Sequence, residues 1–179
     1  KEGVTSIGGR AFYRCTGLTS INIPDSVTSI GYQAFDGCNI KELIIAKGSK
    51  TVTSKMVVCK STLEKVTIPD SVTSIGDSAF YGCTGLTSIT IPDSVTSIGF
   101  GAFSGCSGLT SITIPDSVTS IGGDAFLDTA YYNDNANWGN DVLYISNHLI
   151  KARNNINGAY VIKDGTKCIA DSAFESCTG

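Results

Sequence analysis

The sequence predicts a β-rich solenoid, in which coils of about 23 residues stack on one another through parallel β-sheets and short corner turns. The decapeptide TIPDSVTSIG occurs at residues 67–76, 90–99 and 113–122, so its copies start 23 residues apart. A fixed period of roughly 20–29 residues is the signature of a stacked solenoid. Within each copy, short runs of β-branched residues are bounded by proline and glycine, as expected for short strands joined by turns.

The rest of the chain consists largely of partial or degenerate copies of the same unit. Nine of the ten decapeptide residues recur at 23–31. Residues 2–17 and 165–179 match the second half of a unit. We therefore expect residues 1–179 to form a single solenoid domain that is a fragment of a longer chain. Residues 40–62 have lost the decapeptide, and we expect this degenerate coil to pack less well on its neighbours, because each coil in a stack contacts only the adjacent ones.

The unit at 86–108, LTSITIPDSVTSIGFGAFSGCSG, indicates the structure at each repeat position. Residues 89–91 alternate apolar, polar and apolar, as a half-buried strand does. Pro92 ends this strand because it has no N–H for a neighbouring ladder, and the Asp-Ser pair that follows favours a turn. Residues 95–98 can form a second short strand that ends at Gly99. The AFxGC stretch is short and is predicted to form one helical turn at a corner.

The phenylalanine and cysteine of the AFxxC stretch recur at fixed positions, and we expect both to face the core of the stack. Buried cysteine behaves as a small hydrophobic residue. The seven cysteines include no CxxC pair, which argues against zinc and favours free structural thiols; disulfides between stacked coils are the alternative. The predicted structural core residues are Phe12, Phe35, Phe80, Phe103, Phe126, Phe174, Cys15, Cys38, Cys83, Cys106 and Cys177.

Residues 131–159 interrupt the repeat and predict an inserted β-hairpin module. Residues 142–145 and 148–152 read as two strands around a turn at 146–147, although Ser-Asn is a weaker turn signal than Asn-Gly. Residues 160–162 are then expected to resume the repeat strand. The hairpin would therefore replace the body of one repeat.

The repeat resembles a leucine-rich repeat that departs from the usual pattern. LxxIxI from Leu86 matches its start, but Pro92 follows directly, Ser94 stands where asparagine is expected, and Val95 comes one place early. With the AFxxC ending, these departures resemble the BspA-like leucine-rich repeats of bacterial and protozoan surface proteins. The resemblance implies a right-handed leucine-rich-repeat superhelix, secreted or displayed at the cell surface, that recognises host, neighbouring-cell or matrix proteins.

Composition and motifs give no support to several other functions. The net charge of −3 gives no argument for nucleic acid, which calls for a basic face. No apolar run approaches the ~18 residues of a membrane span, so we expect no membrane insertion of this segment, and no signal peptide is visible at its start. No G-x-S-x-G, HExxH or P-loop motif occurs, and His148 is the only histidine. We therefore predict no catalytic residues, no metal and no cofactor.

A column of aspartates raises calcium binding as the one alternative to the prediction that the chain holds no metal. Calcium requires roughly 6–8 oxygen ligands from several positions, whereas each coil offers a single aspartate beside a turn. Turn capping is the favoured interpretation, and calcium is the alternative. The residues are Asp25, Asp70, Asp93, Asp116 and Asp164.

Candidate ligand-binding residues are sought where the copies differ. The polar Ser and Thr positions repeat almost unchanged, as expected of groups that bond across coils. The variable positions follow the decapeptide glycine and the AF pair, and tyrosine and arginine are common at interfaces. The alternative for the variable positions is that they differ between copies because nothing selects their side chains. The alternative for the aromatic residues of the insertion is that they fill the gap left by the interrupted repeat. The candidates are Arg10, Tyr13, Tyr32, Tyr81, Phe100, Tyr131, Tyr132 and Trp138.

The sequence thus predicts a non-catalytic module for protein binding or adhesion. Two alternatives stay open, namely a carbohydrate-binding or spacer module of a larger protein and a purely structural stalk. An aromatic platform on the surface would favour glycan binding, and a featureless Ser/Thr surface would favour the stalk.

Overall fold

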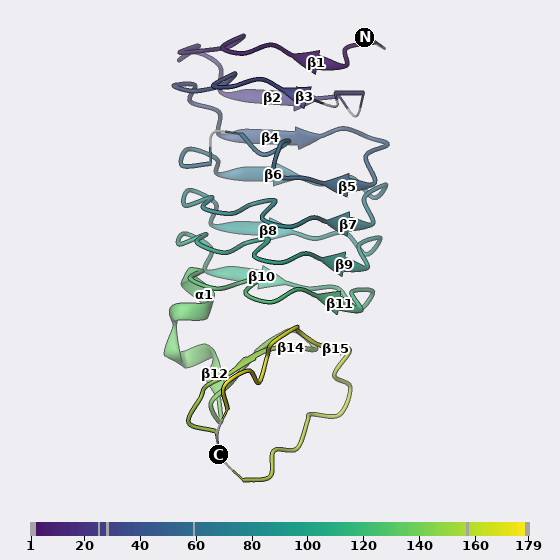
Figure 1. Cartoon of the computed structure of the whole chain (residues 1–179), viewed down its shortest axis with the longest axis vertical. Helices are drawn as coiled ribbons and strands as arrows, with labels where there is room; N and C mark the ends of the chain where they lie inside the picture. Colours follow the sequence, from purple (N-terminus) through teal and green to yellow (C-terminus); the bar gives the residue numbers. More distant parts are fainter. Residues whose placement is uncertain (1–2, 25, 28, 59, 157, 178–179) are drawn as a thin grey trace.

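The computed structural model describes residues 3–24, 26, 27, 29–58, 60–156 and 158–177. They form a parallel-sheet β-solenoid of about seven coils with almost no helix. The coils lie one below another from the N-terminus to the inserted hairpin (Figure 1). The predicted fold class is therefore confirmed.

The first strand of each coil forms one column of the stack. These strands pair in parallel, and each residue lies beside its own copy, as in the pairing of Ile112 with Ile89. Two sheets result, β2-β4-β6 and β8-β10. The column comprises β2 (Ser20–Ile23), β4 (Glu42–Ile45), β6 (Lys65–Thr67), β8 (Ser88–Thr90) and β10 (Ser111–Thr113).

The second, two-residue strand of each coil forms another parallel column. Its members are β1 (Ser6–Ile7), β3 (Ser29–Ile30), β5 (Thr51–Val52), β7 (Ser74–Ile75), β9 (Ser97–Ile98) and β11 (Ser120–Ile121). One ladder joins β1 to β3, and another joins β5, β7, β9 and β11. Among the described residues β3 and β5 are not paired, so this column is interrupted between the second coil and the degenerate third coil.

The glycine that ends each decapeptide lets successive coils approach closely. A Cβ atom on Gly122 would lie 2.5 Å from the backbone nitrogen of Phe100, in the coil before it. The N–H of Gly122 donates to Ile98 O at 2.8 Å, and that of Gly99 to Ile75 O at 2.7 Å. At the end of the second strand, the N–H groups of one coil therefore point to the preceding coil.

The AFxxC corner is a series of tight turns and not the helical turn that the sequence predicted. In the fourth coil, Ala79 N donates to Gly76 O and Tyr81 N to Ser78 O. Two corner residues in this coil, Ser78 and Gly82, have left-handed φ values of 52° and 72°. Because left-handed residues cannot continue a right-handed helix, the chain turns step by step.

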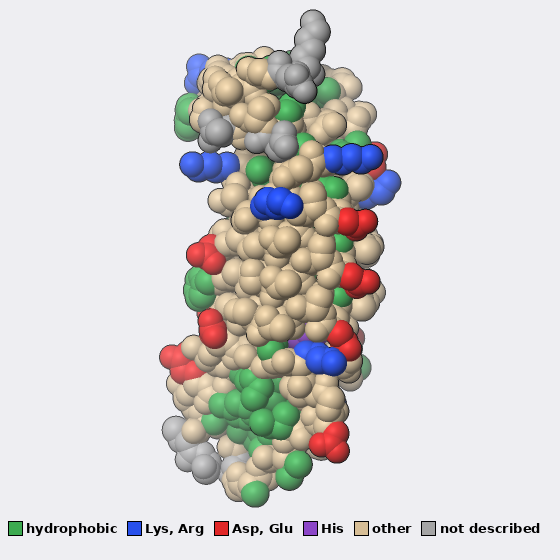
Figure 2. Space-filling view, turned by 90° about the vertical axis from the view of Figure 1, so that its right-hand side faces the viewer, with side chains coloured by type: hydrophobic (Ala, Val, Ile, Leu, Met, Phe, Trp, Pro, Cys, Tyr) green, Lys and Arg blue, Asp and Glu red, His purple; other side chains and the backbone are tan. Residues whose placement is uncertain are grey.

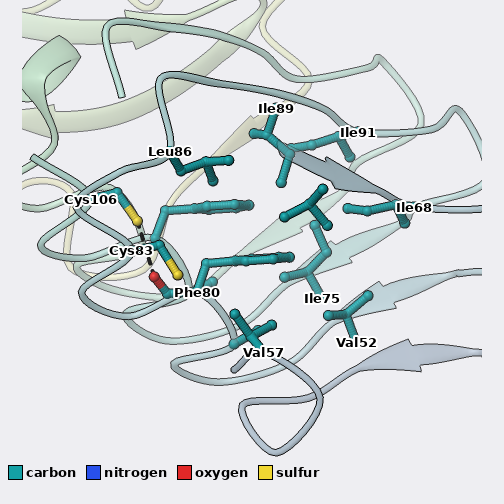
Figure 3. Packing of buried hydrophobic residues seen from close by; sticks show 14 of the residues in the cluster. Val52, Val57, Ile68, Ile75, Phe80, Cys83, Leu86, Ile89, Ile91 and Cys106 are labelled. Atoms are coloured by element: carbon teal, nitrogen blue, oxygen red, sulfur yellow. Dashed lines mark hydrogen bonds between the residues drawn. The ribbon is translucent and has the colours of Figure 1, made fainter. Parts of the chain in front are cut away.

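The phenylalanine and cysteine columns line the interior of the regular coils (Figure 3). The rings of Phe80 and Phe103 are fully buried and stack with centroids 5.1 Å apart. The thiol of Cys106 donates to Phe80 O at 3.0 Å, so a cysteine at this position both fills space and satisfies a buried carbonyl group. Thr129 replaces cysteine in the next coil, where its hydroxyl donates to Phe126 O.

Burial is weaker at the two ends of the stack. Cys15 is exposed, which corrects the expectation that it belongs to the core. In this structure the first coil has a neighbour on one side only, so its corner is not covered. Phe12, Phe174 and Cys177 are half-buried for a similar reason. Phe174 instead packs against Tyr160, at a ring distance of 5.7 Å.

The insertion contains the predicted hairpin. Its elements are α1 (Ala130–Asn133), η1 (Asn135–Asn137), β12 (Trp138–Gly139), β13 (Val142–Ile145) and β14 (His148–Ala152). Strands β13 and β14 are antiparallel around Ser146-Asn147, as the sequence predicted. The following strand, β15 (Cys168–Ile169), pairs with β14 in parallel and so resumes the solenoid.

Residues 160–162 do not resume a strand, contrary to the prediction. The chain swings away from the hairpin before it returns at β15 (Figure 1), and Val161 is 83% exposed. The hairpin partners of β13 are the antiparallel β12 and β14, so β13 has no free edge at which this segment could add a parallel strand.

Candidate binding surface

A backbone ladder holds neighbouring corners together. Phe80 N donates to Ala102 O at 2.7 Å, and Phe103 N to Ala125 O at 2.7 Å. The residues two before and two after each phenylalanine donate in the same way. At the corners, the N–H groups therefore point to the following coil, opposite to those at the ends of the second strands. The ladder fixes the corner backbone without help from the intervening side chains.

Aromatic side chains project from this corner at the positions that vary between coils. We name them the corner ridge, and its members are Tyr13 (39% exposed), Tyr32 (78%), Tyr81 (56%) and Phe100 (57%). Arg10 and Arg14 both lie over the ring of Tyr13, at 5.5 and 5.3 Å from its centroid. Lys60 lies 5.9 Å from the centroid of Tyr81. The ridge thus combines exposed rings with nearby cations.

A groove opens in the corner where the degenerate third coil lies. The ladder joins the first coil to the second, the fourth to the fifth and the fifth to the sixth. Among the described residues, the backbone N–H groups of Gln33 and Gly37 in the second coil have no partner, and no such bond joins the corner of the third coil to that of the fourth. The resulting groove has a volume of about 740 Å³ and is lined in part by Gln33, Gly37, Val57 and Lys60.

The aromatic residues of the insertion lie at the joint between the sixth coil and the hairpin. Tyr131, Tyr132 and Trp138 are half-buried and pack on the core. The indole N–H of Trp138 donates to Tyr132 O at 2.7 Å, and the two rings meet edge to face at 5.2 Å. Arg153 covers the indole at 4.7 Å. Burial raises the pKa of Tyr131.

His148, the first residue of β14, is enclosed between the hairpin and the sixth coil. Its side chain is fully buried, and Nε2 lies 2.9 Å from Val118 O. Nδ1 has no partner among the described residues. This imidazole is therefore a packing residue that joins the hairpin to the sixth coil, away from solvent.

The described cysteines are free thiols. The neighbouring Cys106 thiol and burial together raise the pKa of Cys83 well above its ordinary value, so the Cys83 thiol is neutral and a poor nucleophile. Cys59 lies outside the described residues. Within the described ranges, no group of three His, Cys, Asp or Glu side chains could hold a metal ion. Asp25, one of the stacked aspartates, also lies outside them.

No helix among the described residues is long and apolar enough to cross a membrane.

Sequence reasoning named the aromatic residues of the ridge and the joint but missed the Gln33 and Gly37 N–H groups and Lys60. The 23-residue spacing could have identified Lys60, which stands where Cys83 stands one unit later.

Family and structure comparisons agree with this geometry. The profile of the BspA type leucine rich repeat region matches residues 1–62 and 50–179, with six copies. No curated protein sequence matches the chain. The chain is similar to a solved leucine rich cell surface protein from Faecalibacterium prausnitzii A2-165, with 33% identity and a TM-score of 0.55, over 99% of this chain and 43% of that one.

Two further solved structures are similar. A leucine-rich repeat protein from Bacteroides ovatus is 25% identical, with a TM-score of 0.51, over 98% of this chain and 51% of that one. A leucine rich repeat protein from T. pallidum is 32% identical, with a TM-score of 0.43, over 73% of this chain and 52% of that one. The chain therefore spans about half the length of these solved proteins.

Proposed function

Because this chain belongs to the BspA-type leucine-rich repeat family, we propose that it is a non-catalytic module that binds proteins at a cell surface. Residues 1–179 act as one solenoid module, in which 131–159 replace the body of one repeat. The partner is a protein of a host cell, a neighbouring cell or the surrounding matrix. The similar protein from F. prausnitzii is described as a cell surface protein, which supports this location.

The corner ridge is the observation that carries the proposal. Tyrosine and arginine are enriched at protein interfaces relative to the rest of the surface. Tyr32 and Tyr81 are the most exposed tyrosines, and both stand at positions that differ between coils. A regular backbone thus presents a side-chain pattern that is specific to this chain. The buried position of His148 and the neutral thiol of Cys83 support a non-catalytic role.

Retention on cells tests the proposal and separates it from its alternatives. Beads coated with the purified chain are expected to adhere to cultured epithelial cells, and to lose adhesion when the cells are first treated with protease. Loss after glycosidase treatment, with protease treatment having no effect, would favour the carbohydrate-binding module. No adhesion to any cell surface or matrix protein would favour the spacer or stalk.

A double variant assigns the adhesion to the ridge. Tyr32→Ser with Tyr81→Ser is expected to reduce bead retention at least severalfold, because aromatic anchors dominate interfaces. Thr110→Ala, a change at an exposed residue just before β10, is the matched control and should leave retention unchanged.

The carbohydrate alternative has one observation in its favour. Tyr32, Tyr81 and Phe100 expose their rings at the corners of their coils, and exposed aromatic faces also stack on sugars. The protease and glycosidase treatments above distinguish the two partners.

A further inference from the structure

The degenerate third coil is the most basic part of the molecule. Residues 40–65 contain six lysines, whereas residues 66–150 contain eight aspartates and no lysine, arginine or glutamate. Lysine and arginine side chains gather on the upper coils, and acidic side chains lie on the middle coils (Figure 2). Lys41 and Lys65 are paired with Glu64 and Glu42. The local field at the third coil therefore favours an anionic partner.

The groove at this coil presents backbone donors that the regular corners use for stacking. Gln33 and Gly37 correspond to Ser78 and Gly82, whose N–H groups donate to Phe100 O and Ser104 O of the next coil at 2.8 and 2.9 Å. In an intact corner these two acceptors are thus carbonyl groups four residues apart in one peptide segment. At the groove the two donors are fixed in the same left-handed conformation, with φ of 54° and 75°, but no acceptor among the described residues meets them.

Lys60 brings a positive charge to the same groove. It replaces the buried cysteine of the regular corner and is half-buried. Its ammonium group lies 5.9 Å from the centroid of the Tyr81 ring, and its side chain lines the groove. Asp36 is the acidic residue in the lining, and its side chain is exposed.

We propose that this groove binds an acidic peptide segment of a partner protein. Two carbonyl oxygens of the peptide, four residues apart, accept hydrogen bonds from the N–H groups of Gln33 and Gly37, and a peptide carboxylate pairs with Lys60. The segment thereby completes the interrupted corner ladder, as an added strand completes a sheet edge. This inference rests on the proposed protein-binding function and names the chemistry of the partner.

Fluorescence anisotropy with a labelled octaglutamate peptide tests the charge requirement. The purified chain is expected to bind octaglutamate more tightly than octaglutamine at low salt. Lys60→Gln should weaken octaglutamate binding about tenfold, the expected loss for one charge-assisted contact. The matched control is Lys55→Gln, which changes an exposed lysine of the same coil that does not line this groove. Equal binding of the two peptides, or equal losses in the two variants, would contradict the proposal.

Restoring the regular corner tests the ladder requirement. Replacing residues 53–59 with GDSAFYG, the sequence of residues 76–82, keeps Lys60, supplies the missing acceptors from within the chain and closes the groove. This variant should be more stable than the parent and should lose octaglutamate binding, so the loss could not be attributed to unfolding. Undiminished binding by the stabilised variant would overturn the proposal. If bead adhesion to cells persists while octaglutamate fails to bind, the proposed function stands and only the groove assignment is wrong.

Discussion

The corner phenylalanine is the residue on which packing of the regular coils depends most. Phe103 lies between Phe80 and Phe126, at centroid distances of 5.1 and 5.4 Å, and the rings are within 6° of parallel. Coils in a β-ladder are ~4.8 Å apart, so flat rings tilted to the stacking axis fill the interior without a gap. Each ring therefore supports the two coils beside it.

Truncation of one ring should be costly. Phe103→Ala is expected to lower the free energy of unfolding by ~3–5 kcal/mol, because it leaves a cavity between two other rings. Phe100→Ala, in the same coil but 57% exposed, is the control and should change it by less than about 0.5 kcal/mol. Chemical denaturation measures both. A loss below about 1 kcal/mol for Phe103→Ala would contradict the buried position of this side chain.

Thiol reactivity should follow burial. In the folded chain, iodoacetamide is expected to modify the exposed Cys15 quickly and the fully buried Cys83 and Cys106 only slowly, because the reagent must reach the sulfur atom. In denaturant without reductant, mass spectrometry should find every thiol modified. The seventh, Cys59, is included in this prediction although it lies outside the described residues. A cysteine pair that resists alkylation until reduced would show a disulfide.

At the scale of single residues, the repeat pattern predicted the inward direction of Phe80 and Cys83 but not the state of the end coils. Cys15 has the same sequence context as Cys83 yet is exposed, because burial requires a coil on both sides. The repeat pattern also gave no indication of the groove at the third coil. Backbone N–H groups such as that of Gly37 carry no sequence signal, and whether they are paired depends on the adjacent coil.

Among the structural elements, the second and third coils are joined less completely than the regular coils are joined to one another. The β2–β4 ladder is present there, but β3 and β5 are not paired, and Gln33 and Gly37 lack their corner bonds. Val57 stands where the regular coils have phenylalanine. In a one-dimensional stack, stability is approximately a sum over coils and interfaces, so this interface is expected to open first.

Hydrogen exchange can locate this opening. Amides around residues 46–60 are expected to exchange faster than the corresponding amides at 69–83, because local opening follows few contacts and missing ladders. Exchange monitored by mass spectrometry or NMR compares the two segments within one sample. Equal protection of the two segments from exchange would mean that the degenerate coil packs in a different way, with other contacts in place of its lost bonds.

Asp116 of the sixth coil contributes to anchoring the hairpin. Asp116 accepts a hydrogen bond from Asn147 Nδ2 at 2.9 Å and lies 3.4 Å from Lys167 Nζ. The bond from Asn147 is the main cause that lowers the pKa of Asp116. A carboxylate with a lowered pKa stabilises the fold above its ordinary pKa of 3.8, and that contribution is lost as pH falls through the folded value.

The variant Asp116→Asn should therefore lower the melting temperature at pH 7 by a small amount. The difference from the parent should shrink as the pH falls below 3.8, because the parent carboxylate also becomes neutral. Asp93→Asn is the control, since Asp93 occupies the same repeat position without these partners. Thermal unfolding followed by circular dichroism at several pH values measures the effect. A difference that stays constant with pH would exclude the ionic anchor.

The sequence predicted the hairpin strands because residues 142–152 carry their own alternation and turn. It could not predict that residues 160–162 would leave the stack. These residues have the same pattern as a repeat strand, but a strand forms only where a neighbour offers a free edge. The antiparallel hairpin removed that edge.

Across the whole molecule, charge is distributed unevenly along the stack. The middle coils contain only acidic ionisable residues of the Asp, Glu, Lys and Arg types, and Asp70, Asp93 and Asp116 follow one another at the same repeat position. Like charges one coil apart repel each other, and salt screens this repulsion. The degenerate coil has Lys47 at this position, which relieves the repulsion locally.

The melting temperature is therefore expected to rise between about 10 and 300 mM NaCl at neutral pH. Asp93→Lys, which copies the lysine of the degenerate coil, should reduce this salt dependence. Asp134→Lys, outside the stacked row, serves as the control for the change in net charge. A decrease in melting temperature with added salt would show that attractive pairs outweigh the repulsion along the row.

The opposite directions of the hydrogen bonds on the two sides of each coil have an electrical consequence. At the corners the N–H groups point toward the C-terminal end of the stack, as from Phe80 to Ala102, whereas those of Gly99 and Gly122 point toward its N-terminal end. In an α-helix the peptide dipoles are aligned and add up to partial charges at the two ends. Here opposing peptide dipoles largely cancel within each coil. Further coils can thus be added without a growing macrodipole, and the length of the solenoid is not limited by a need for charged caps.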